Sequence, residues 1–304
     1  MDITAGSVAD LFRGFRVLYD EALQSAPTDW QDVASRTTST SAEELYAWLG
    51  AIPSMKEFLG ELVLDAVSQC DWTIRNRKWA EAVQVPREAI ERDSYGIYNP
   101  VMSSLGRVAA QHPDSLLAEL FANAFTNSAA GRDYTGKPFF AADKKHEPNN
   151  PKTTTFSNAA TAVLDETSLK NAITNIKSRK NNAGRSMKLG RKLLLVVPPA
   201  LEFTAKALLQ NEKNAAGADN ILRNAAQIKV LPDLTSNTAW FLMETGLEIK
   251  PFIFQVEKEP KLSSLVDPNN PHTFFTDQFV YKADGRYNMS YGIPQLCYGS
   301  TGAG

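Results

Sequence analysis

One stretch, residues 101–126, constrains the fold of this chain more than any other. Its apolar residues recur at steps of three and four, apart from one longer gap around His112, as on one side of a helix. These residues are Val101, Leu105, Val108, Ala109, Leu116, Leu117, Leu120, Phe121, Ala124 and Phe125. Pro100 suits a first helical turn, whereas Pro113 near the middle predicts a kink or a break. A continuous helix here would be about 39 Å long, longer than a small globular domain needs.

A second amphipathic helix is predicted over residues 8–24. Its apolar face consists of Val8, Leu11, Phe12, Phe15, Leu18, Tyr19, Ala22 and Leu23. Ser7 suits the N-cap of this helix, and Pro27 ends it. A helical face this apolar needs a surface to lie on, which could belong to its own chain or to a neighbouring copy.

Residues 31–85 are predicted to form an extended arm. Residues 31–41 are rich in Thr and Ser and have almost no large apolar side chains, which is typical of an exposed strand or loop. Residues 72–75 and 79–85 alternate with period two, as strands do, and residues 55–67 carry a short helical pattern. The range could form a long two-stranded ribbon with helical decoration. Because such a ribbon is marginally stable alone, we expect it to pack on something else.

The second half of the chain has an α/β pattern, which follows a polar, loop-rich range at 127–160. Residues 165–180 and 200–210 are predicted helices, and residues 192–197 are a buried strand. Further strands are predicted at 228–231, 240–243, 248–255 and within 278–300. The fold class is therefore α+β with one α/β-like portion. A long helix between an extended hairpin and a compact domain suggests a building block and not a catalyst.

Composition excludes several classes of protein. The 304 residues carry a formal net charge of −2, which gives no global attraction to nucleic acid or to an anionic membrane. No apolar run approaches the ~20 residues that span a bilayer, and the N-terminus lacks the layout of a signal peptide. Cys70 and Cys297 are the two cysteines, which fits a reducing compartment. We expect a protein that is made and stays in a cytoplasm-like environment.

The sequence offers little catalytic or metal chemistry. None of its three histidines, His112, His146 and His272, lies four residues from another, as the ligands of a helical metal site do, and two cysteines cannot form a zinc knuckle. There is no nucleophile elbow, phosphate-binding loop or dinucleotide fingerprint, so no cofactor is expected. A Cys–His pair could still assemble in space from Cys70 or Cys297, although a buried structural thiol is favoured.

A cluster of basic residues lies between the helix at 165–180 and the strand at 192–197. It comprises Lys177, Arg179, Lys180, Arg185, Lys188, Arg191 and Lys192, without an acidic residue among them. The cluster could face packaged nucleic acid or an acidic patch on a neighbouring subunit. It could instead be a solvated loop whose lysines lie along apolar surface, and we favour this second interpretation.

Many aromatic residues fall in or near the predicted arm. These are Trp30, Tyr46, Trp48, Phe58, Trp72 and Trp79. Their rings could pack locally within the arm or anchor contacts between subunits, where Trp and Tyr are enriched. We weigh the two interpretations equally. The candidate inter-subunit anchors are Phe12, Phe15, Trp48, Trp72 and Trp79.

Several short motifs match a known family in order and spacing. They are residues 46–50 followed by Pro53, residues 87–93, 95–100 and 109–114, residues 136–140 leading to His146, and residues 194–199, 240–242, 251–254 and 298–300. With these motifs the chain resembles, nearly end to end, the major head subunit family of Mu-like bacteriophages. One departure is at residues 143–146, where the family more often has a tighter Asp-His pair.

The resemblance implies the coat-protein fold shared by tailed phages. It divides the chain into an N-terminal arm at 1–30, an extended loop at 31–85 that lies over a neighbouring subunit, and a peripheral domain at 86–160 with a spine helix at 100–126. An axial domain at 161–270 then meets its copies at the centre of each hexamer or pentamer. Residues 271–304 are strands that return through the peripheral domain and end at the axial domain.

The resemblance also implies the function: a major capsid protein, not an enzyme, that self-assembles as hexamers and pentamers into an icosahedral shell around double-stranded DNA. The expected partners are copies of itself, a portal and packaged DNA bound non-specifically, with no membrane. The chain starts without a long, charged, helix-rich segment, so the scaffold is expected to be a separate protein unless this is the mature form. The expected location is the virion, assembled in the cytoplasm of a bacterial host.

Three rival interpretations remain open at this point. The nearest is the shell protein of a bacterial nanocompartment, which encloses cargo enzymes and not DNA. A tube-forming tail protein is a second, although such a protein is expected to be mainly β. A cytosolic hydrolase built on Cys70 or Cys297 is the third, and it would need a partly exposed thiol with a lowered pKa.

Overall fold

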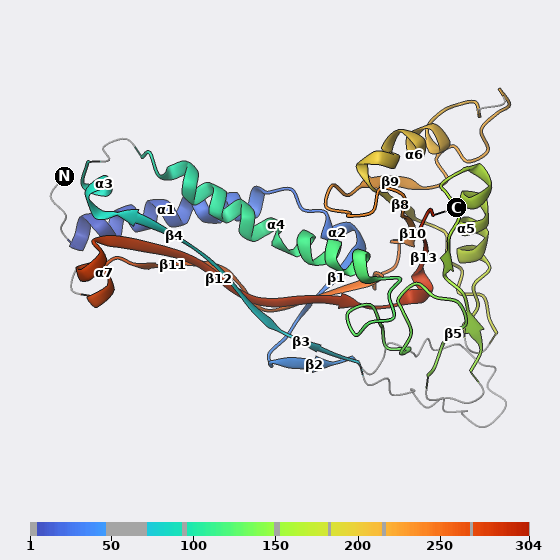
Figure 1. The fold of residues 1–304 in the computed structure, drawn as a ribbon, viewed down its shortest axis with the longest axis horizontal. Coiled ribbons are helices and arrows are strands. Elements are labelled where there is room, and N and C mark those ends of the chain that lie inside the picture. The colour runs from blue at the N-terminus through green and yellow to red at the C-terminus, as the bar shows by residue number, and fades with distance from the viewer. Residues whose placement is uncertain are drawn as a thin grey trace, which may run out of the picture.

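The long helix predicted from the sequence is present as α4, Asn99–Asn123. In the computed structural model, residues 5–46, 72–92, 96–148, 153–181, 184–214, 217–267 and 270–303 are described. The molecule is elongated, with α4 and a long sheet forming a narrow part and a second sheet forming a wide end (Figure 1). Among the described residues, no helix combines the length and apolarity needed to cross a bilayer.

Pro113 does not break α4, contrary to one alternative predicted from the sequence. The helix continues through Pro113, which is buried. A proline inside a helix removes one backbone hydrogen bond and costs roughly 3 kcal/mol, but this segment is fixed from both sides. The carboxylate of Asp114 accepts the backbone N–H groups of Asp29 and Trp30 at 2.9 and 2.7 Å. The buried side chains of Leu116 and Leu117 follow directly.

The N-terminal helix α1, Ala5–Ser25, lies along α4 and packs on its own chain. Phe15 and Tyr19 are buried with residues of α4 and of the long sheet. The two helices approach most closely at Gly106, where an added Cβ would lie 2.4 Å from the carbonyl oxygen of Tyr19. The sequence left open which surface this apolar helix covers, and the structure gives a surface of its own chain.

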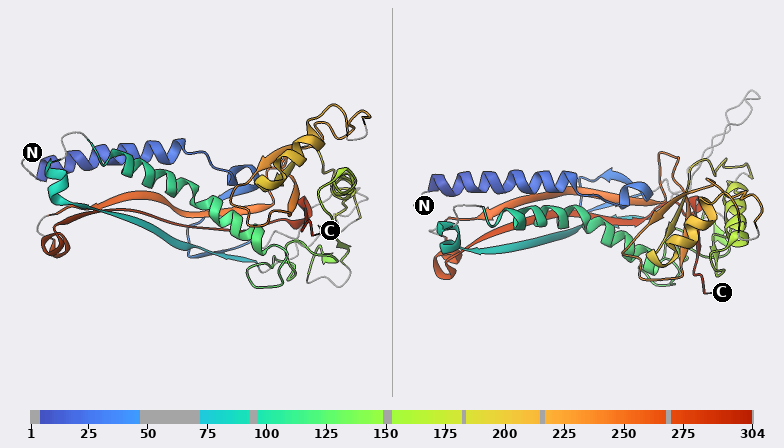
Figure 2. Two further views of the ribbon diagram at one scale, coloured as in Figure 1. Left: turned by 45° about the horizontal axis from the view of Figure 1, so that its top comes forward. Right: turned by 90° about the horizontal axis from the view of Figure 1, so that it is seen from above.

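The long sheet has the strand order β1–β11–β12–β4. Its strands are β1 Ala34–Thr38, β11 Phe252–Leu265, β12 Gln278–Tyr291 and β4 Arg77–Pro86. Along β12 the buried residues alternate with less buried ones, from Phe279 to Tyr291. Because alternate side chains of a strand point to opposite faces, one face of the sheet is buried. That face is covered by α1 and α4, which both lie on the same side of the strands (Figures 1 and 2).

The predicted two-stranded arm is only partly correct. Strand β1 pairs in parallel with β11, and β4 pairs antiparallel with β12, so both belong to the long sheet. The described ribbon is limited to β2, Glu43–Leu45, and β3, Thr73–Arg75. The predicted helix at 55–67, which contains Phe58, lies outside the described residues, and so does Trp48. Local alternation identified the strands, but it carries no information on which strand each one pairs with.

The wide end contains a five-stranded sheet in the order β7–β13–β10–β8–β9. The strands are β7 Ala159–Ala160, β13 Cys297–Ser300, β10 Trp240–Glu244, β8 Leu193–Val197 and β9 Gln227–Val230. Helix α5, Glu166–Lys177, packs against β10 and β13, and α6, Glu202–Leu209, packs against β8 and β9. The predicted strands at 192–197, 228–231 and 240–243 are confirmed. The strand predicted at 248–255 instead begins at Phe252 and belongs to the long sheet.

The remaining elements are short. They are α2 Trp30–Val33, α3 Arg87–Arg92, β5 Lys144–Lys145, β6 Thr155–Phe156, α7 Pro271–Thr276 and the 3-10 turns Pro199–Leu201 and Pro294–Leu296. Strand β11 lies within the residues expected to form an axial domain, 161–270, and it pairs with β1 and β12 of the long sheet.

The polar range 127–160 is held by one buried lysine. Lys144 and Asp133 are both buried, and the lysine Nζ lies 2.5 Å from the carboxylate. The same Nζ donates to the carbonyl oxygens of Pro138 and Phe139 at 2.7 and 3.1 Å. An ammonium group has three N–H donors, so all of them are used. Lys144 lies in the segment where the chain departs from the family pattern.

The contact at Gly106 predicts a sharp difference between two glycines. We expect Gly106→Ala to lower the midpoint of thermal unfolding, because the added Cβ meets backbone atoms that cannot move independently. Gly14→Ala in α1 is the matched control, since its added Cβ would meet nothing within 4 Å. That control should gain about 0.5–1 kcal/mol from helix propensity. Equal shifts for both variants would contradict a close helix contact.

The buried ion pair predicts a large loss when only one partner is removed. Lys144→Met leaves the Asp133 carboxylate buried without a cation, and we expect the free energy of unfolding to fall by about 3–5 kcal/mol in denaturant titration. Lys145→Met, at the exposed neighbouring position, should stay within about 0.5 kcal/mol of the original chain. Adding Asp133→Asn to Lys144→Met should recover part of the loss. A Lys144→Met variant as stable as the control would show that the pair is dispensable.

Candidate functional site

The predicted basic cluster forms a hairpin between α5 and β8. Its two sides are joined by hydrogen bonds from the Met187 N–H to the Arg179 carbonyl at 3.0 Å and from the Asn181 N–H to the Arg185 carbonyl at 2.8 Å. Six of its seven basic residues are exposed. They are Lys177, Lys180, Arg185, Lys188, Arg191 and Lys192. All six belong to the segment from Lys177 to Lys192 at the wide end, which we call the basic hairpin.

The exit of the basic hairpin is fixed by Glu244 of β10. Its buried carboxylate accepts the backbone N–H groups of Gly190, Arg191 and Lys192 at 2.6, 2.9 and 3.1 Å. Because those bonds run to the main chain, the side chains of Arg191 and Lys192 are free to point into solvent. The Glu244 carboxylate thus serves as a backbone anchor.

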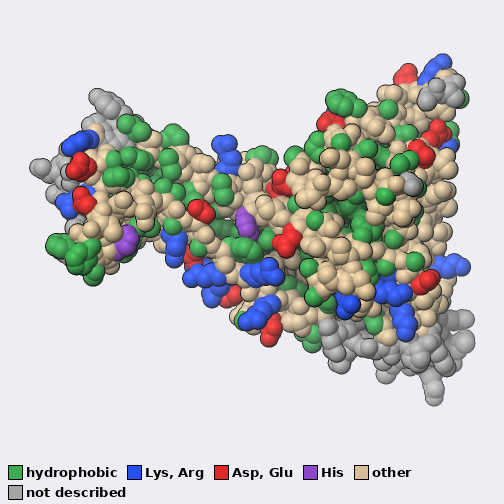
Figure 3. All heavy atoms as spheres, viewed as in Figure 1, with side chains coloured by type: hydrophobic (Ala, Val, Ile, Leu, Met, Phe, Trp, Pro, Cys, Tyr) green, Lys and Arg blue, Asp and Glu red, His purple; other side chains and the backbone are tan. Residues whose placement is uncertain are grey.

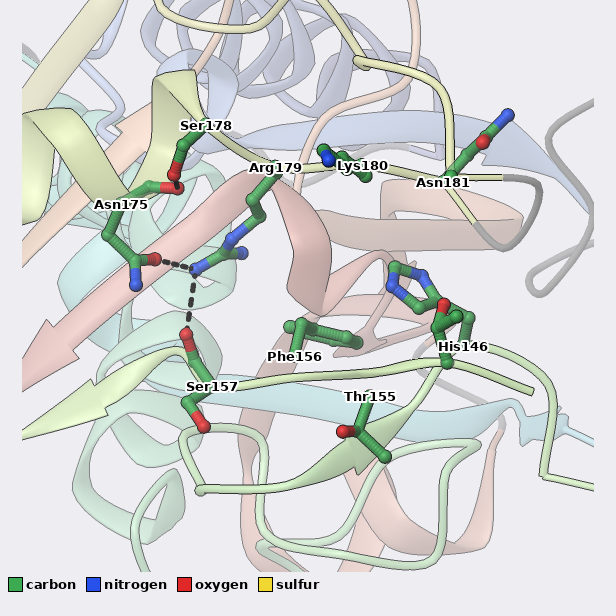
Figure 4. Close-up of a pocket in the computed structure, with 11 residues that line it drawn as sticks. His146, Thr155, Phe156, Ser157, Asn175, Ser178, Arg179, Lys180 and Asn181 are labelled. Carbon is green, nitrogen blue, oxygen red and sulfur yellow. Dashed lines mark hydrogen bonds between the residues drawn. The ribbon is translucent and has the colours of Figure 1, made fainter. Parts of the chain in front are cut away.

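Arg179 does not belong to the exposed surface, and its assignment to a DNA- or neighbour-facing loop is wrong. The residue is 5% exposed. Its guanidinium donates to the carbonyls of Pro294 and Gln295 at 3.2 and 2.6 Å. It also donates to Asn175 Oδ1 at 2.6 Å and to the Ser157 carbonyl at 3.4 Å (Figure 4). Desolvation lowers the pKa of this guanidinium to about 10. The residue ties α5 to the chain entering β13.

A polar hollow of about 300 Å³ lies beside Arg179 (Figure 4). His146 lines it, with its ring 4.8 Å from that of Phe156. Burial, together with the nearby Arg179 charge, lowers the pKa of His146 to about 4, so the ring is neutral at pH 7. Within the described ranges, no group of three His, Cys, Asp or Glu residues could hold a metal ion.

Cys297 cannot serve as a hydrolase nucleophile. It is fully buried, and burial raises its pKa well above the usual range of a thiol. A reactive cysteine needs the opposite, an accessible sulfur with a lowered pKa. Cys70, the other candidate, lies outside the described residues.

The predicted aromatic anchors mostly contact their own chain. Phe15 is 1% exposed and has no accessible surface to offer a neighbour, whereas Phe12 is partly buried against the same core. Trp79 donates its indole N–H to the Tyr287 carbonyl at 3.0 Å, and Trp72 packs against the main core. Trp48 lies outside the described residues. Phe12, Trp72 and Trp79 keep partial exposure, so a role between subunits stays a prediction for them.

Phe274 and Phe275 of α7 are strongly exposed aromatic residues that the sequence did not single out. Their side chains are 73% and 83% exposed, and that of Phe203 in α6 is 78% exposed. Phe274 and Phe275 lie at the narrow end of the molecule, where hydrophobic side chains gather at the surface (Figures 1 and 3). The local sequence does not distinguish them from core residues, because adjacent apolar residues of a helix can both be buried, as Leu116 and Leu117 of α4 are.

Comparisons with known proteins identify the family. The model of the family described as "Mu-like prophage major head subunit gpT" matches residues 8–163, 158–234 and 233–303. The chain is similar to the Mu-like prophage FluMu major head subunit of Haemophilus influenzae, with 26% identity over 99% of this chain and 75% of the relative. It is also similar to the major capsid protein of Escherichia phage Mu, with 23% identity over 99% of this chain and 76% of that protein.

A solved structure shares the fold. The procapsid of bacteriophage JBD30 matches with a TM-score of 0.61 and 23% identity, over 98% of this chain and 76% of that one. The expected tailed-phage coat-protein fold is thereby confirmed. The chain belongs to the family of Mu-like prophage major head subunits and is a structural, non-catalytic protein of the phage head.

Proposed function

We propose that this head subunit assembles as hexamers and pentamers into a closed icosahedral shell around double-stranded DNA. The observation that carries this proposal is the protomer's shape, with a compact wide end and a long sheet covered by helices on one face only (Figure 2). The wide end would meet its copies at the centre of each capsomer. The elongated part, with its β2–β3 ribbon, would reach over neighbouring subunits.

Other components of the head complete the proposal. A separate scaffold protein and a portal would guide assembly, which would take place in the cytoplasm of a bacterial host. A nanocompartment shell would use a related architecture around cargo enzymes, but membership in a phage head family argues against that alternative. DNA as the content is supported by the basic hairpin, which offers six exposed cations at one surface.

The basic hairpin would face the interior of the shell and bind phosphate groups without sequence preference. Lysine and arginine contacts to phosphate release counterions, which makes such binding strong at low salt and weak at high salt. Because the Glu244 carboxylate is bonded to backbone N–H groups, it leaves the charges of Arg191 and Lys192 available.

Charge reversal in this hairpin tests the assignment. We expect Lys188→Glu with Arg191→Glu to lower the fraction of DNA-filled heads severalfold while empty shells still form, because the added negative charges repel phosphate. The measurement is the ratio of absorbance at 260 and 280 nm for heads purified from infected cells. The control is Arg107→Glu with Lys213→Glu, which makes the same charge change at exposed positions elsewhere. Normally filled heads from the hairpin variant would favour a merely solvated loop.

The exposed phenylalanines of α7 would contact a neighbouring subunit. Two side chains this exposed on a monomer gain their burial energy only on assembly, and aromatic residues dominate such contacts. This position at the narrow end suits a contact between elongated parts of adjacent copies.

Changing both phenylalanines tests this contact. We expect Phe274→Ser with Phe275→Ser to leave the thermal unfolding of the unassembled chain within about 0.5 kcal/mol, since both rings are exposed. The yield of closed shells in electron micrographs should fall severalfold. Val17→Ser, at an exposed position of α1, is the control. Shells formed by the double variant at the normal yield would exclude α7 from the subunit contacts.

A further inference from the structure

A groove beside the β2–β3 ribbon contains arginines without acidic partners. It has a volume of about 220 Å³ and is lined by Arg75, Arg77 and Arg132, with Glu119 as the one acidic lining residue. All three arginines are exposed. Within the described part of the chain, neither Arg75 nor Arg77 forms an ion pair, and the Arg132 Nε donates to the neutral Asn127 side chain at 2.9 Å. Three guanidinium groups around a polar concavity are a typical arrangement for binding carboxylates or phosphates.

Three arginines meet two acidic residues at this arginine groove. Glu119 lines it, and Glu43 lies opposite Arg75 in the β2–β3 ribbon. Farther along β12, Asp284 pairs with Lys258 at 3.0 Å and lies 3.7 Å from Lys282. Lys and Arg side chains gather along this edge of the molecule, below the middle of Figure 3.

The floor of the arginine groove has a further unused donor. Trp72 lines the groove, and its indole N–H is buried without a hydrogen-bond acceptor in the structure. A buried donor without an acceptor is unfavourable. A small rearrangement on binding would allow an acceptor from an incoming chain to reach it.

The chain itself contains a segment of the opposite charge. Residues 57–74 include Glu57, Glu61, Asp65 and Asp71 and no Lys, Arg or His. Most of this acidic segment, residues 57–71, lies outside the described residues. In the sequence it lies between β2 and β3, where the Tyr46 N–H bonds to the Trp72 carbonyl at 2.8 Å.

We infer that the arginine groove binds the acidic segment of a second copy of this chain. The inference rests on the proposed function, in which the extended loop reaches a neighbouring subunit, and it names the receiving surface and the interaction. Arginine–carboxylate pairs formed across the contact determine which edge of the neighbour the segment selects. Such pairs give specificity and orientation to an interface.

The test uses two variants with opposite defects. The groove variant, Arg75→Glu with Arg77→Glu, has two acidic surfaces. The segment variant, Glu57→Lys with Glu61→Lys and Asp65→Lys, has two basic surfaces. Each variant alone should lower the yield of shells about tenfold, because like charges then meet across every contact. All five changes in one chain should restore the yield.

Co-expression of the two variants separates a contact between copies from one within a chain. In a mixed shell the basic segment of one copy meets the acidic groove of the other, and the unchanged segment meets the unchanged groove. Mixing should therefore restore shells that contain both variants, as judged by electron microscopy and mass spectrometry. If the five-change chain assembles but the mixture does not, the segment binds its own chain and the inference is wrong.

Two further outcomes separate this inference from the proposed function. If the segment variant fails to assemble but the groove variant forms normal shells, the loop reaches a neighbour elsewhere, so the proposed function stands and the inference falls. Failure of the five-change chain to recover would also overturn it. Thermal unfolding of each unassembled variant checks its folding. Should reversal unfold the chain, Arg75→Gln with Arg77→Gln takes its place, and an unchanged salt sensitivity of its shells would refute the contact.

Discussion

The structure depends on the close packing of α1 and α4 over one face of the long sheet. Gly106 lets the two helix backbones approach, so that Phe15 and Tyr19 reach Tyr281 and its neighbours beneath them. The Phe15 and Tyr281 rings meet edge to face at 5.3 Å. A two-stranded ribbon would be only marginally stable in water, whereas four strands covered by two long helices bury enough apolar surface to form a stable elongated structure. The narrow part of the molecule can therefore project far from the wide end.

Buried charges have a different role at the wide end, where they position irregular chain. Lys144 binds the carbonyls of Pro138 and Phe139, Arg179 binds those entering β13, and Glu244 binds three N–H groups after the basic hairpin. Buried backbone groups that lack a hydrogen-bond partner are costly, and irregular loops lack the regular backbone hydrogen bonds of a sheet or helix. Each buried side chain replaces several missing backbone bonds, which holds the surface loops in one conformation before assembly.

Periodicity made the helices and most strands predictable, because burial on one face produces a repeating pattern of apolar residues in the sequence. The pairing of strands produces no such local pattern, so β4 was placed in a ribbon although it pairs with β12. Arg179 was assigned to the surface because its neighbours in sequence are exposed, and only the fold shows the carbonyls that it reaches. Of the predicted anchors, Phe15 could not be distinguished from a core residue, since amphipathicity is the same whether the covering surface belongs to the same chain or to another.

The segregation of charge explains how a nearly neutral chain can assemble with a defined geometry. A net charge of −2 over 304 residues provides little attraction or repulsion between copies as wholes. The charged residues within 57–74 are nevertheless all acidic, whereas basic residues predominate in the arginine groove and the basic hairpin. Opposite charges on separate surfaces favour contacts in one orientation and disfavour others. Apolar contacts such as those proposed for Phe274 and Phe275 lack this directionality, so charge would select the register of the contact and burial would stabilise it.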